Sequence, residues 1–225
     1  KTVQRVLLDD VDGYELTAGT EGDQISLARK RTQTYLYHHR KIIKVSTPTT
    51  RDLSRIEREF LRSDMRFYFA QCPYCKHFQF LRFSEHESSR YAHLGTSRLS
   101  FDKENLSWVY YECENCKVKL EEKDRLEMIR NGRWYITKPD VQGHAGFHLS
   151  EMISPFSNWR EVARQFLEAK QSRETLRVFV NQTLGETFVE ERSWELSDDD
   201  LLKRVEDYTL IPAGVLTMTA QVDVQ

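Results

Sequence analysis

Two Cys-x-x-Cys pairs constrain the fold of this chain more than any other feature of its sequence. Cys72-Pro73-Tyr74-Cys75 and Cys113-Glu114-Asn115-Cys116 contain all four cysteines of the 225 residues. Each pair can present two thiolates to one metal ion from a single tight turn, and two such turns make a tetrahedral four-sulfur zinc site. Because sulfur would fill all four positions, the pattern predicts a structural zinc ion rather than a catalytic one.

The segments around both pairs favour the same interpretation. Aromatic and β-branched residues flank the first pair at 67–70 and 78–81, and the second pair at 108–111 and 118–120. Such runs on both sides of a turn are typical of hairpin strands. Two disulfides or four unrelated core thiols are the competing interpretations, but the charge-rich composition is typical of cytosolic proteins, where disulfides are rare. The sequence therefore predicts a zinc ribbon.

Composition sets broader limits. Lys and Arg number 33 against 35 Asp and Glu, so any contact with nucleic acid must come from local patches. No apolar run is long enough to cross a bilayer, and we expect no membrane partner. Both ends of the chain fall in strand-like runs, so we expect a piece of a larger protein. The histidines near the cysteines are expected on the surface, because four sulfurs already satisfy zinc: His77, His86 and His93.

An apolar run near the start ends in two carboxylates. Val6-Leu7-Leu8 precedes Asp9 and Asp10. A continuous apolar strand suits a parallel sheet buried on both faces, and ligands of such sheets lie beyond the carboxyl ends of the strands. This is the Walker B pattern, in which the first carboxylate orients nucleotide-bound Mg²⁺ and the second activates the attacking water. A calcium-binding EF-hand loop fails here, because Leu8 and Gly19 would fill its end positions. A plain acidic turn stays open as an alternative.

A hydroxyl-rich turn follows the next expected strand. A helix is expected over residues 23–37, then a strand over 41–45 that runs into Ser46-Thr47-Pro48-Thr49-Thr50. P-loop-type motors place their coupling motif in such a turn, where hydroxyls near the γ-phosphate sense hydrolysis. An ordinary Ser/Thr/Pro turn capping the next helix, expected over 53–61, is an equally good interpretation.

Later segments add helices and one more carboxylate. Helical spacing is found over 121–131, 159–170 and 174–184, and a polar loop or hairpin tip is expected over 84–100. Residues 216–224 alternate strictly between apolar and polar, with Asp223 on the polar side. RNase H-like nucleases begin their metal site with a carboxylate on a strand, but a single aspartate is more simply explained as structural.

The order of these runs is more specific than any one of them. It resembles the large terminase subunit of lambda-type tailed phages over essentially the whole chain. The runs that carry the resemblance are Leu7–Asp12, Val45–Thr49, Leu53–Glu57, Phe69–Cys75, Ala145–Ser150, Phe179–Glu186 and Leu216–Gln225.

The resemblance implies an ATPase that drives DNA into a preformed capsid and an RNase H-like nuclease that cuts concatemeric DNA. Asp9 matches the Mg²⁺-orienting Walker B aspartate, and Asp10 lies where the family usually has a catalytic glutamate. Aspartate is one methylene shorter, and a misplacement of about 1 Å can cost on the order of 100-fold in rate. Ser46, Thr47 and Thr49 match the coupling motif.

The resemblance also implies the domain plan of an α/β protein. Asp223 matches the first Mg²⁺- or Mn²⁺-binding aspartate of the nuclease. The expected parts are the end of a P-loop-type parallel-sheet ATPase domain (1–66), a zinc-ribbon insert (67–120), a helical segment closing the ATPase domain (121–189), an acidic linker (190–210) and the start of the nuclease (211–225). No Gly-x-x-x-x-Gly-Lys-Ser/Thr loop occurs in the 225 residues, so we expect this piece alone neither to hydrolyse ATP nor to cut DNA.

The partners implied are ATP, double-stranded DNA, the small terminase subunit, the portal protein and further copies of the chain, in the host cytoplasm. The alternative is a non-catalytic zinc-ribbon module that binds DNA or a partner protein, with the acidic strand end incidental.

Overall fold

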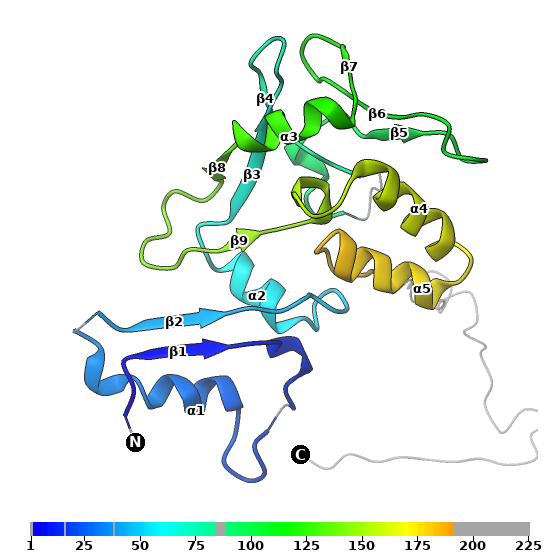
Figure 1. Ribbon diagram of the computed structural model, residues 1–225. Coiled ribbons are helices and arrows are strands. Elements are labelled where there is room, and N and C mark those ends of the chain that lie inside the picture. The colour runs from blue at the N-terminus through cyan, green and yellow to red at the C-terminus, as the bar shows by residue number, and fades with distance from the viewer. Residues whose placement is uncertain (1, 16, 38, 84–88, 191–225) are drawn as a thin grey trace, which may run out of the picture. The chain divides into compact units, whose positions relative to one another are not determined.

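The computed structural model describes residues 2–15, 17–37, 39–83 and 89–190 (Figure 1). The chain divides into two compact units, 1–190 and 191–225. The second unit lies outside the described residues, and so do most of the expected acidic linker and the strand expected around Asp223.

The N-terminal part is a parallel pair of strands with a helical crossover (Figure 1). The side chain of Asp23 accepts a hydrogen bond from the backbone N–H of Ser26 and starts the helix. This helix is shorter than the 23–37 expected, because a 3-10 turn at Gln33–Tyr35 replaces its second half. The elements are β1 (Arg5–Leu8), a 3-10 turn (Val11–Gly13), α1 (Gln24–Lys30) and β2 (Lys41–Lys44).

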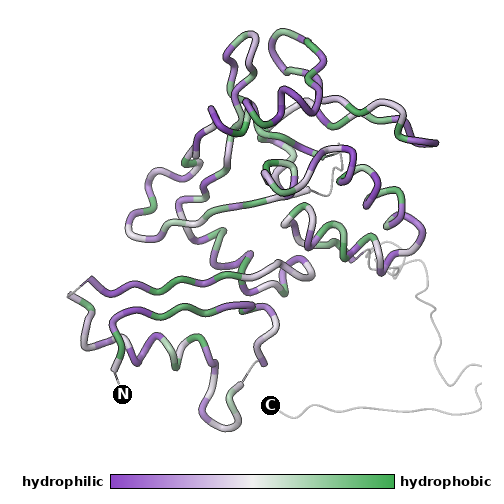
Figure 2. Tube along the Cα trace, in the orientation of Figure 1, coloured by the Kyte–Doolittle hydropathy of each residue, from purple (hydrophilic) through white to green (hydrophobic). Residues whose placement is uncertain are grey.

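Burial on both faces, expected for the first strand, is wrong for the described residues. Leu7 is 67% exposed, and its register partner Ile43 on β2 is 53% exposed. Of the residues in β1 and the 3-10 turn after it, only Leu8 and Val11 are buried. Figure 2 shows that apolar residues run along both strands all the same.

The next helix, α2 (Arg55–Leu61), lies within the predicted range 53–61. Ser54 caps it by accepting a hydrogen bond from the N–H of Glu57. Phe60 points from it into a cluster with Phe67 and Tyr91, where ring centroids lie 5.3 and 6.0 Å from that of Phe60.

Two antiparallel hairpins lead into and out of the cysteine pairs, as predicted. The first belongs to a four-stranded sheet and the second to a three-stranded sheet. The segment expected as a loop or hairpin tip over 84–100 contains a 3-10 turn at Ala92–Leu94, and a strand begins at Leu99, so the expected loop is two residues too long. The strands are β3 (Arg66–Gln71), β4 (Phe78–Phe80), β5 (Leu99–Phe101), β6 (Val109–Glu112) and β7 (Lys119–Leu120).

The segment 121–189 contributes strands as well as the expected helices. Its two strands extend the first ribbon sheet, one antiparallel and the other parallel to β3. Figure 2 shows apolar positions alternating with polar ones along the last two helices. The elements are α3 (Glu122–Arg130), β8 (Arg133–Ile136), β9 (Phe147–His148), a 3-10 turn (Glu151–Ile153), α4 (Trp159–Ala169), α5 (Arg173–Val178) and a π-helical turn (Phe179–Thr183).

The larger hydrophobic core joins the second hairpin to α3 and α4. Tyr111, Leu120, Met128 and Trp159 are buried in it, with the rings of Tyr111 and Trp159 5.7 Å apart. The guanidinium of Arg125, also buried, donates a hydrogen bond of 2.7 Å to the carbonyl of Ser154. Among the helices of the described residues, none is both long enough and apolar enough to span a membrane.

Candidate functional site

The parallel pairing of β1 and β2 brings two loops to one edge of the sheet. Backbone hydrogen bonds continue past the strands, from Val45 N to the Leu8 carbonyl (2.9 Å) and from Val11 N to the Val45 carbonyl (3.3 Å). The acidic loop, residues 9–13, therefore lies beside the hydroxyl loop, residues 46–50. This is the edge where open α/β sheets bind ligands.

Two of the predicted site residues are in direct contact there. The hydroxyl of Ser46 donates a hydrogen bond of 3.2 Å to Oδ1 of Asp10. The backbone of Asp10 is left-handed (φ 51, ψ 50), and its N–H donates to Oδ1 of Asp9 at 3.1 Å. A Cβ at Gly13 would come within 3.0 Å of Oδ2 of Asp10, so glycine leaves room for this carboxylate. Both Asp9 and Asp10 are exposed to solvent.

Asp12 connects the two loops to α2, a role that the sequence did not reveal. Its Oδ2 accepts a hydrogen bond from the hydroxyl of Thr49 (2.9 Å), and its Oδ1 accepts one from the N–H of Ile56 (2.7 Å). Its own N–H donates to the Ser46 hydroxyl at 3.1 Å. Ile56 lies in the first turn of α2, where N–H groups have no partner within the helix, so Asp12 acts as a second cap.

The remaining predicted residue of the hydroxyl loop lies at its outer side. The side chain of Thr47 is exposed, and its carbonyl oxygen lies 2.9 Å from the Ser46 hydroxyl, whose single proton it shares with Asp10. Exposed carboxylates beside hydroxyl and carbonyl oxygens form a donor set that suits Mg²⁺. The residues at this edge therefore fit the metal that a Walker B site requires.

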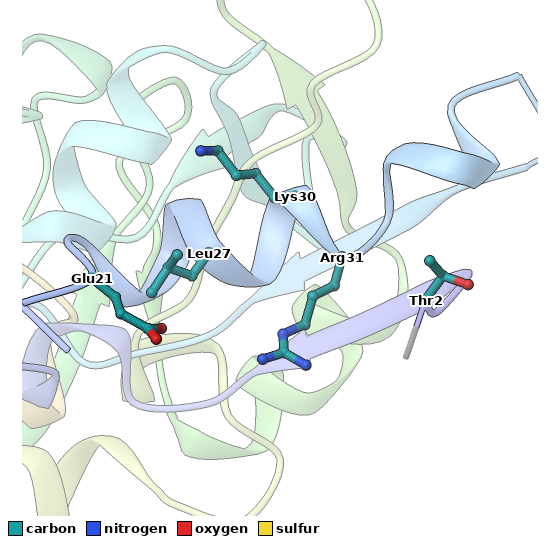
Figure 3. A pocket seen from close by; sticks show the side chains of 5 residues that line it. All are labelled: Thr2, Glu21, Leu27, Lys30 and Arg31. Carbon is teal, nitrogen blue, oxygen red and sulfur yellow. The ribbon is translucent and has the colours of Figure 1, made fainter.

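A shallow hollow lies elsewhere on the N-terminal part (Figure 3). Its volume is about 440 Å³, and its lining side chains come from α1 and the segments next to it. Residues of the acidic and hydroxyl loops do not line it, so it is not part of the candidate site. The lining residues are Thr2, Glu21, Leu27, Lys30 and Arg31.

The four cysteines converge on one point, as the spacing predicts. Their sulfur atoms all lie within 4.8 Å of one another. The Sγ atoms of Cys72 and Cys116 are 3.9 Å apart, and those of Cys75 and Cys113 are 3.6 Å apart. Zn–S bonds of about 2.3 Å in a tetrahedron require sulfur separations of about 3.8 Å. The cluster therefore fits a tetrahedral metal ion.

The two cysteine turns have the same backbone construction. In each, the N–H of the residue four positions after the first cysteine donates to the carbonyl of that cysteine, at 3.0 Å for Lys76 and 3.1 Å for Lys117. Both lysines are left-handed, with φ values of 61 and 60. Of the nearby histidines, His77 is on the surface as expected, 3.8 Å from Glu114, His93 is exposed, and His86 lies outside the described residues.

The pKa values of three of the thiols depart from the ordinary value because burial and hydrogen bonding act on each of them to a different extent. Burial raises the pKa of Cys72, and it raises that of Cys113 to about 12. Burial acts in the same direction on Cys75, but hydrogen bonds from the backbone of His77 and from the side chains of Asn115 and Cys116 outweigh it and lower this pKa to about 6.

Comparison with known proteins identifies the class. The chain belongs to the gpA family of phage terminase large subunits: the family model described as "Phage terminase large subunit gpA, ATPase domain" matches residues 1–134. The model described as "Terminase large subunit gpA, endonuclease domain" matches residues 144–225. The resemblance that the sequence indicated is thus confirmed.

Two curated relatives are each named "Terminase, large subunit". That of Enterobacteria phage P21 is 29% identical over 248 aligned positions, which cover 100% of this chain and 36% of that protein. That of Escherichia phage lambda is 30% identical over 245 positions, which cover 96% of this chain and 36% of that protein. The chain thus spans about a third of the length of these relatives. No solved structure gives a significant match.

Proposed function

We propose that this chain is the central part of a DNA-packaging terminase large subunit, carrying half of an ATPase site, a zinc ribbon and the start of a nuclease. The observation that carries the proposal is the hydrogen bond between Ser46 and Asp10 at the carboxyl edge of two parallel strands. Family membership supports the same assignment.

The acidic loop would serve ATP hydrolysis. Asp9 is proposed to hold Mg²⁺, which when bound neutralises charge on the nucleotide phosphates. Asp10 is proposed to accept the proton of the attacking water, in the position where the family usually has glutamate. Ser46 binds Oδ1 of Asp10 and so fixes the direction of the other oxygen. The left-handed backbone of Asp10 offers a way for the shorter side chain to reach its target.

The hydroxyl loop would couple hydrolysis to movement. We propose Ser46, Thr47 and Thr49 as the coupling residues. The Thr49 hydroxyl binds Asp12, and Asp12 binds the first turn of α2. A shift of the hydroxyl loop on loss of the γ-phosphate would therefore be passed to α2 through two hydrogen bonds.

The four cysteines are proposed to bind one structural Zn²⁺ ion, since the spacing of their sulfur atoms matches a tetrahedral site. Asp223, which lies outside the described residues, is proposed as the first metal ligand of an RNase H-like nuclease using Mg²⁺ or Mn²⁺. The domain limits inferred from the sequence, with the nuclease starting at residue 211, are part of the same proposal, and they differ from the endonuclease family model, whose match begins at residue 144.

The activity and partners of the whole protein belong to the proposal too. They are ATP-driven translocation of double-stranded DNA, cutting of concatemers, binding to the small terminase subunit and the portal protein, and assembly of several copies in the host cytoplasm. Two relatives named as large terminase subunits support them.

ATP turnover by the complete protein that contains this chain tests the proposal. Asp9→Asn removes the charge that would hold Mg²⁺ and should lower kcat by roughly 100-fold or more. Asp140→Asn changes an exposed carboxylate remote in sequence from both loops and should leave turnover unchanged. Full activity in Asp9→Asn would contradict the assignment.

Two substitutions test Asp10: one removes the proposed base, and the other replaces it with the longer carboxylate. Asp10→Asn should lower kcat by a similar factor because an amide cannot accept the proton. Asp10→Glu restores the side chain usual in the family. If Asp10 is the base, Asp10→Glu keeps at least part of the activity that Asp10→Asn loses.

A further inference from the structure

The hydroxyl loop is also bound by residues 181–188, which follow it by more than 130 positions in the sequence. The side-chain amide nitrogen of Asn181 donates hydrogen bonds of 2.8 Å to the carbonyl of Thr49 and of 2.8 Å to the carbonyl of Glu186. Asn181 is buried, with 9% of its surface exposed. Its amide group therefore bridges two backbone segments in the interior.

A second set of bonds strengthens the same junction. The N–H of Phe188 donates to the carbonyl of Thr49 at 3.0 Å, and the N–H of Arg51 donates to the carbonyl of Phe188 at 3.0 Å. The Thr49 carbonyl thus accepts from a backbone group and from Asn181, which occupies both of its lone pairs. Close by, the hydroxyl of Thr187 donates to the buried carboxylate of Glu57 on α2 at 2.7 Å.

Asn181 is fixed by the element that carries it. It lies in the π-helical turn Phe179–Thr183, and such turns are rare and are frequently found at functional sites. Phe179 anchors this turn in the larger core, with its ring 5.0 Å from that of Phe83. The hydroxyl of Thr183 donates to Oε1 of Gln165 on α4 at 2.8 Å. The amide of Asn181 therefore extends from a rigid base.

Thr49 connects the π-helical turn that carries Asn181 to the acidic loop. Its carbonyl is held by Asn181, and its hydroxyl donates to Asp12. Asp12 in turn donates its N–H to Ser46, which binds Asp10. A chain of hydrogen bonds therefore runs from Asn181 to the carboxylate proposed as the base.

We propose that Asn181 is a positioning residue of the ATPase site, which holds the hydroxyl loop where Ser46 and Thr49 can bind the acidic loop. This rests on the proposed function for its catalytic part and deepens it. Asn181 does not touch Asp10, so it acts on the rate of hydrolysis through the geometry of the two loops. Loss of its amide should lower kcat for ATP and leave KM largely unchanged.

Two variants and a matched control test the proposal in the complete protein. Asn181→Asp has the same shape but cannot donate to either carbonyl, and Asn181→Ala removes the amide without adding a charge. Gln182→Glu makes the same amide-to-carboxylate change at the exposed neighbouring position. We expect roughly a tenfold fall in kcat, with KM for ATP within about twofold, for both Asn181 variants and no change for the control.

Amide hydrogen exchange tests the positioning without using the activity. The amides of Phe188, Arg51 and Asp12 should exchange about tenfold faster or more in Asn181→Ala, because one of the bonds holding Thr49 is lost. The Asp12 amide is the decisive one, since it is bonded to Ser46 rather than to the junction itself. Gln182→Glu should exchange like the wild type.

The outcomes separate the two proposals. Normal kcat in Asn181 variants of an active protein overturns the positioning role, and so does unchanged exchange at Asp12. If Asn181→Asp does not fold, Asn181→Ala decides both measurements. A wild-type protein without ATP turnover contradicts the proposed function, and in that case exchange at Asp12 alone decides whether Asn181 holds the hydroxyl loop.

Discussion

Two regions of the molecule are built on short apolar strands: the ribbon, formed by the two cysteine hairpins within residues 67–120, and the acidic edge, formed by β1, β2 and the loops that follow them. The strands of the two regions differ in how deeply their apolar side chains are buried. Phe67, Tyr111 and Leu120 in the ribbon strands are fully buried. Leu7 and Ile43 in β1 and β2 are more than half exposed. The ribbon is held by a hydrophobic core and a cluster of four sulfurs, whereas the acidic edge is held by hydrogen bonds among Asp, Ser and Thr side chains.

Under the proposed function, stability and chemistry belong to different parts of this chain. The proposed four-sulfur zinc site would have no open position for a substrate, so the proposal gives the ribbon a structural role. The acidic edge has exposed carboxylates, and the apolar side chains of its two strands are exposed in a chain that spans about a third of its relatives' length. The predictions below test this division, from the largest expected effect to the smallest.

Loss of zinc should have the largest effect, and it should destabilise the ribbon far more than the acidic edge. We expect one zinc ion per chain by metal analysis, and Cys72→Ser should unfold the ribbon, because structural zinc contributes roughly 10–16 kcal/mol in small modules. Exchange of the Val45 amide, which is bonded across β1 and β2, should change far less. His77→Ala should keep the zinc. A folded, metal-free wild-type protein would refute the zinc site.

Truncating one apolar side chain in each region should show the same difference between the regions, with a smaller loss in the free energy of unfolding. Trp159 is buried against Tyr111, and Trp159→Ala should lower the free energy of unfolding by about 3–5 kcal/mol. Ile43→Ala removes a half-exposed side chain and should cost no more than about 0.5 kcal/mol in residues 1–225. Urea unfolding measures both. Equal losses would mean that the N-terminal strand pair is covered, contrary to the structure.

The smallest effect concerns acid stability at the edge of the ribbon sheet. Asp64 is buried, and its carboxylate accepts hydrogen bonds of 2.8 and 2.6 Å from Arg66 and one of 3.1 Å from the N–H of Gly146. The Arg66 guanidinium lowers the pKa of this carboxyl below its ordinary value of 3.8. A lowered pKa means that the contribution is complete above that value and is lost as the pH falls through the folded-state value.

Asp64→Asn should therefore lower the free energy of unfolding by about 1–3 kcal/mol at pH 7. The difference from wild type should shrink as the pH is lowered below 3.8, since the native carboxyl is then protonated as well. Urea titrations at several pH values measure this, with Asp140→Asn as control. A difference that is constant with pH would exclude the proposed ion pair as its cause.

Local patterns in the sequence were sufficient for much of the fold. Helical spacing located α2, α3 and α4 to within about two residues at each end, because their apolar faces recur at regular intervals. The cysteine spacing located both hairpin turns. The sequence placed the acidic loop and the hydroxyl loop after two successive strands, and the parallel pairing of these strands brings Ser46 to Asp10.

Contacts between distant segments could not be predicted in this way. Asp12 caps α2 across 44 residues, and Asn181 binds Thr49 across 132, so no spacing in the sequence indicates either. The pairing of β8 with β3 depends on a return of the chain after about 65 residues, which periodicity does not encode. Burial of β1 was misjudged because an apolar run does not say whether anything packs on it.

The bridge between Thr50 and Phe188 has a consequence for modularity. The chain leaves the acidic edge at Thr50 and returns beside Thr50 at Phe188, so residues 51–187 form an excursion whose two ends are neighbours. An excursion of this kind can lengthen, shrink or be exchanged without moving the strands from which it starts. The ribbon within it, residues 67–120, could therefore be exchanged as a cassette, provided that α2, Asn181 and the two backbone hydrogen bonds between Thr49, Arg51 and Phe188 are kept.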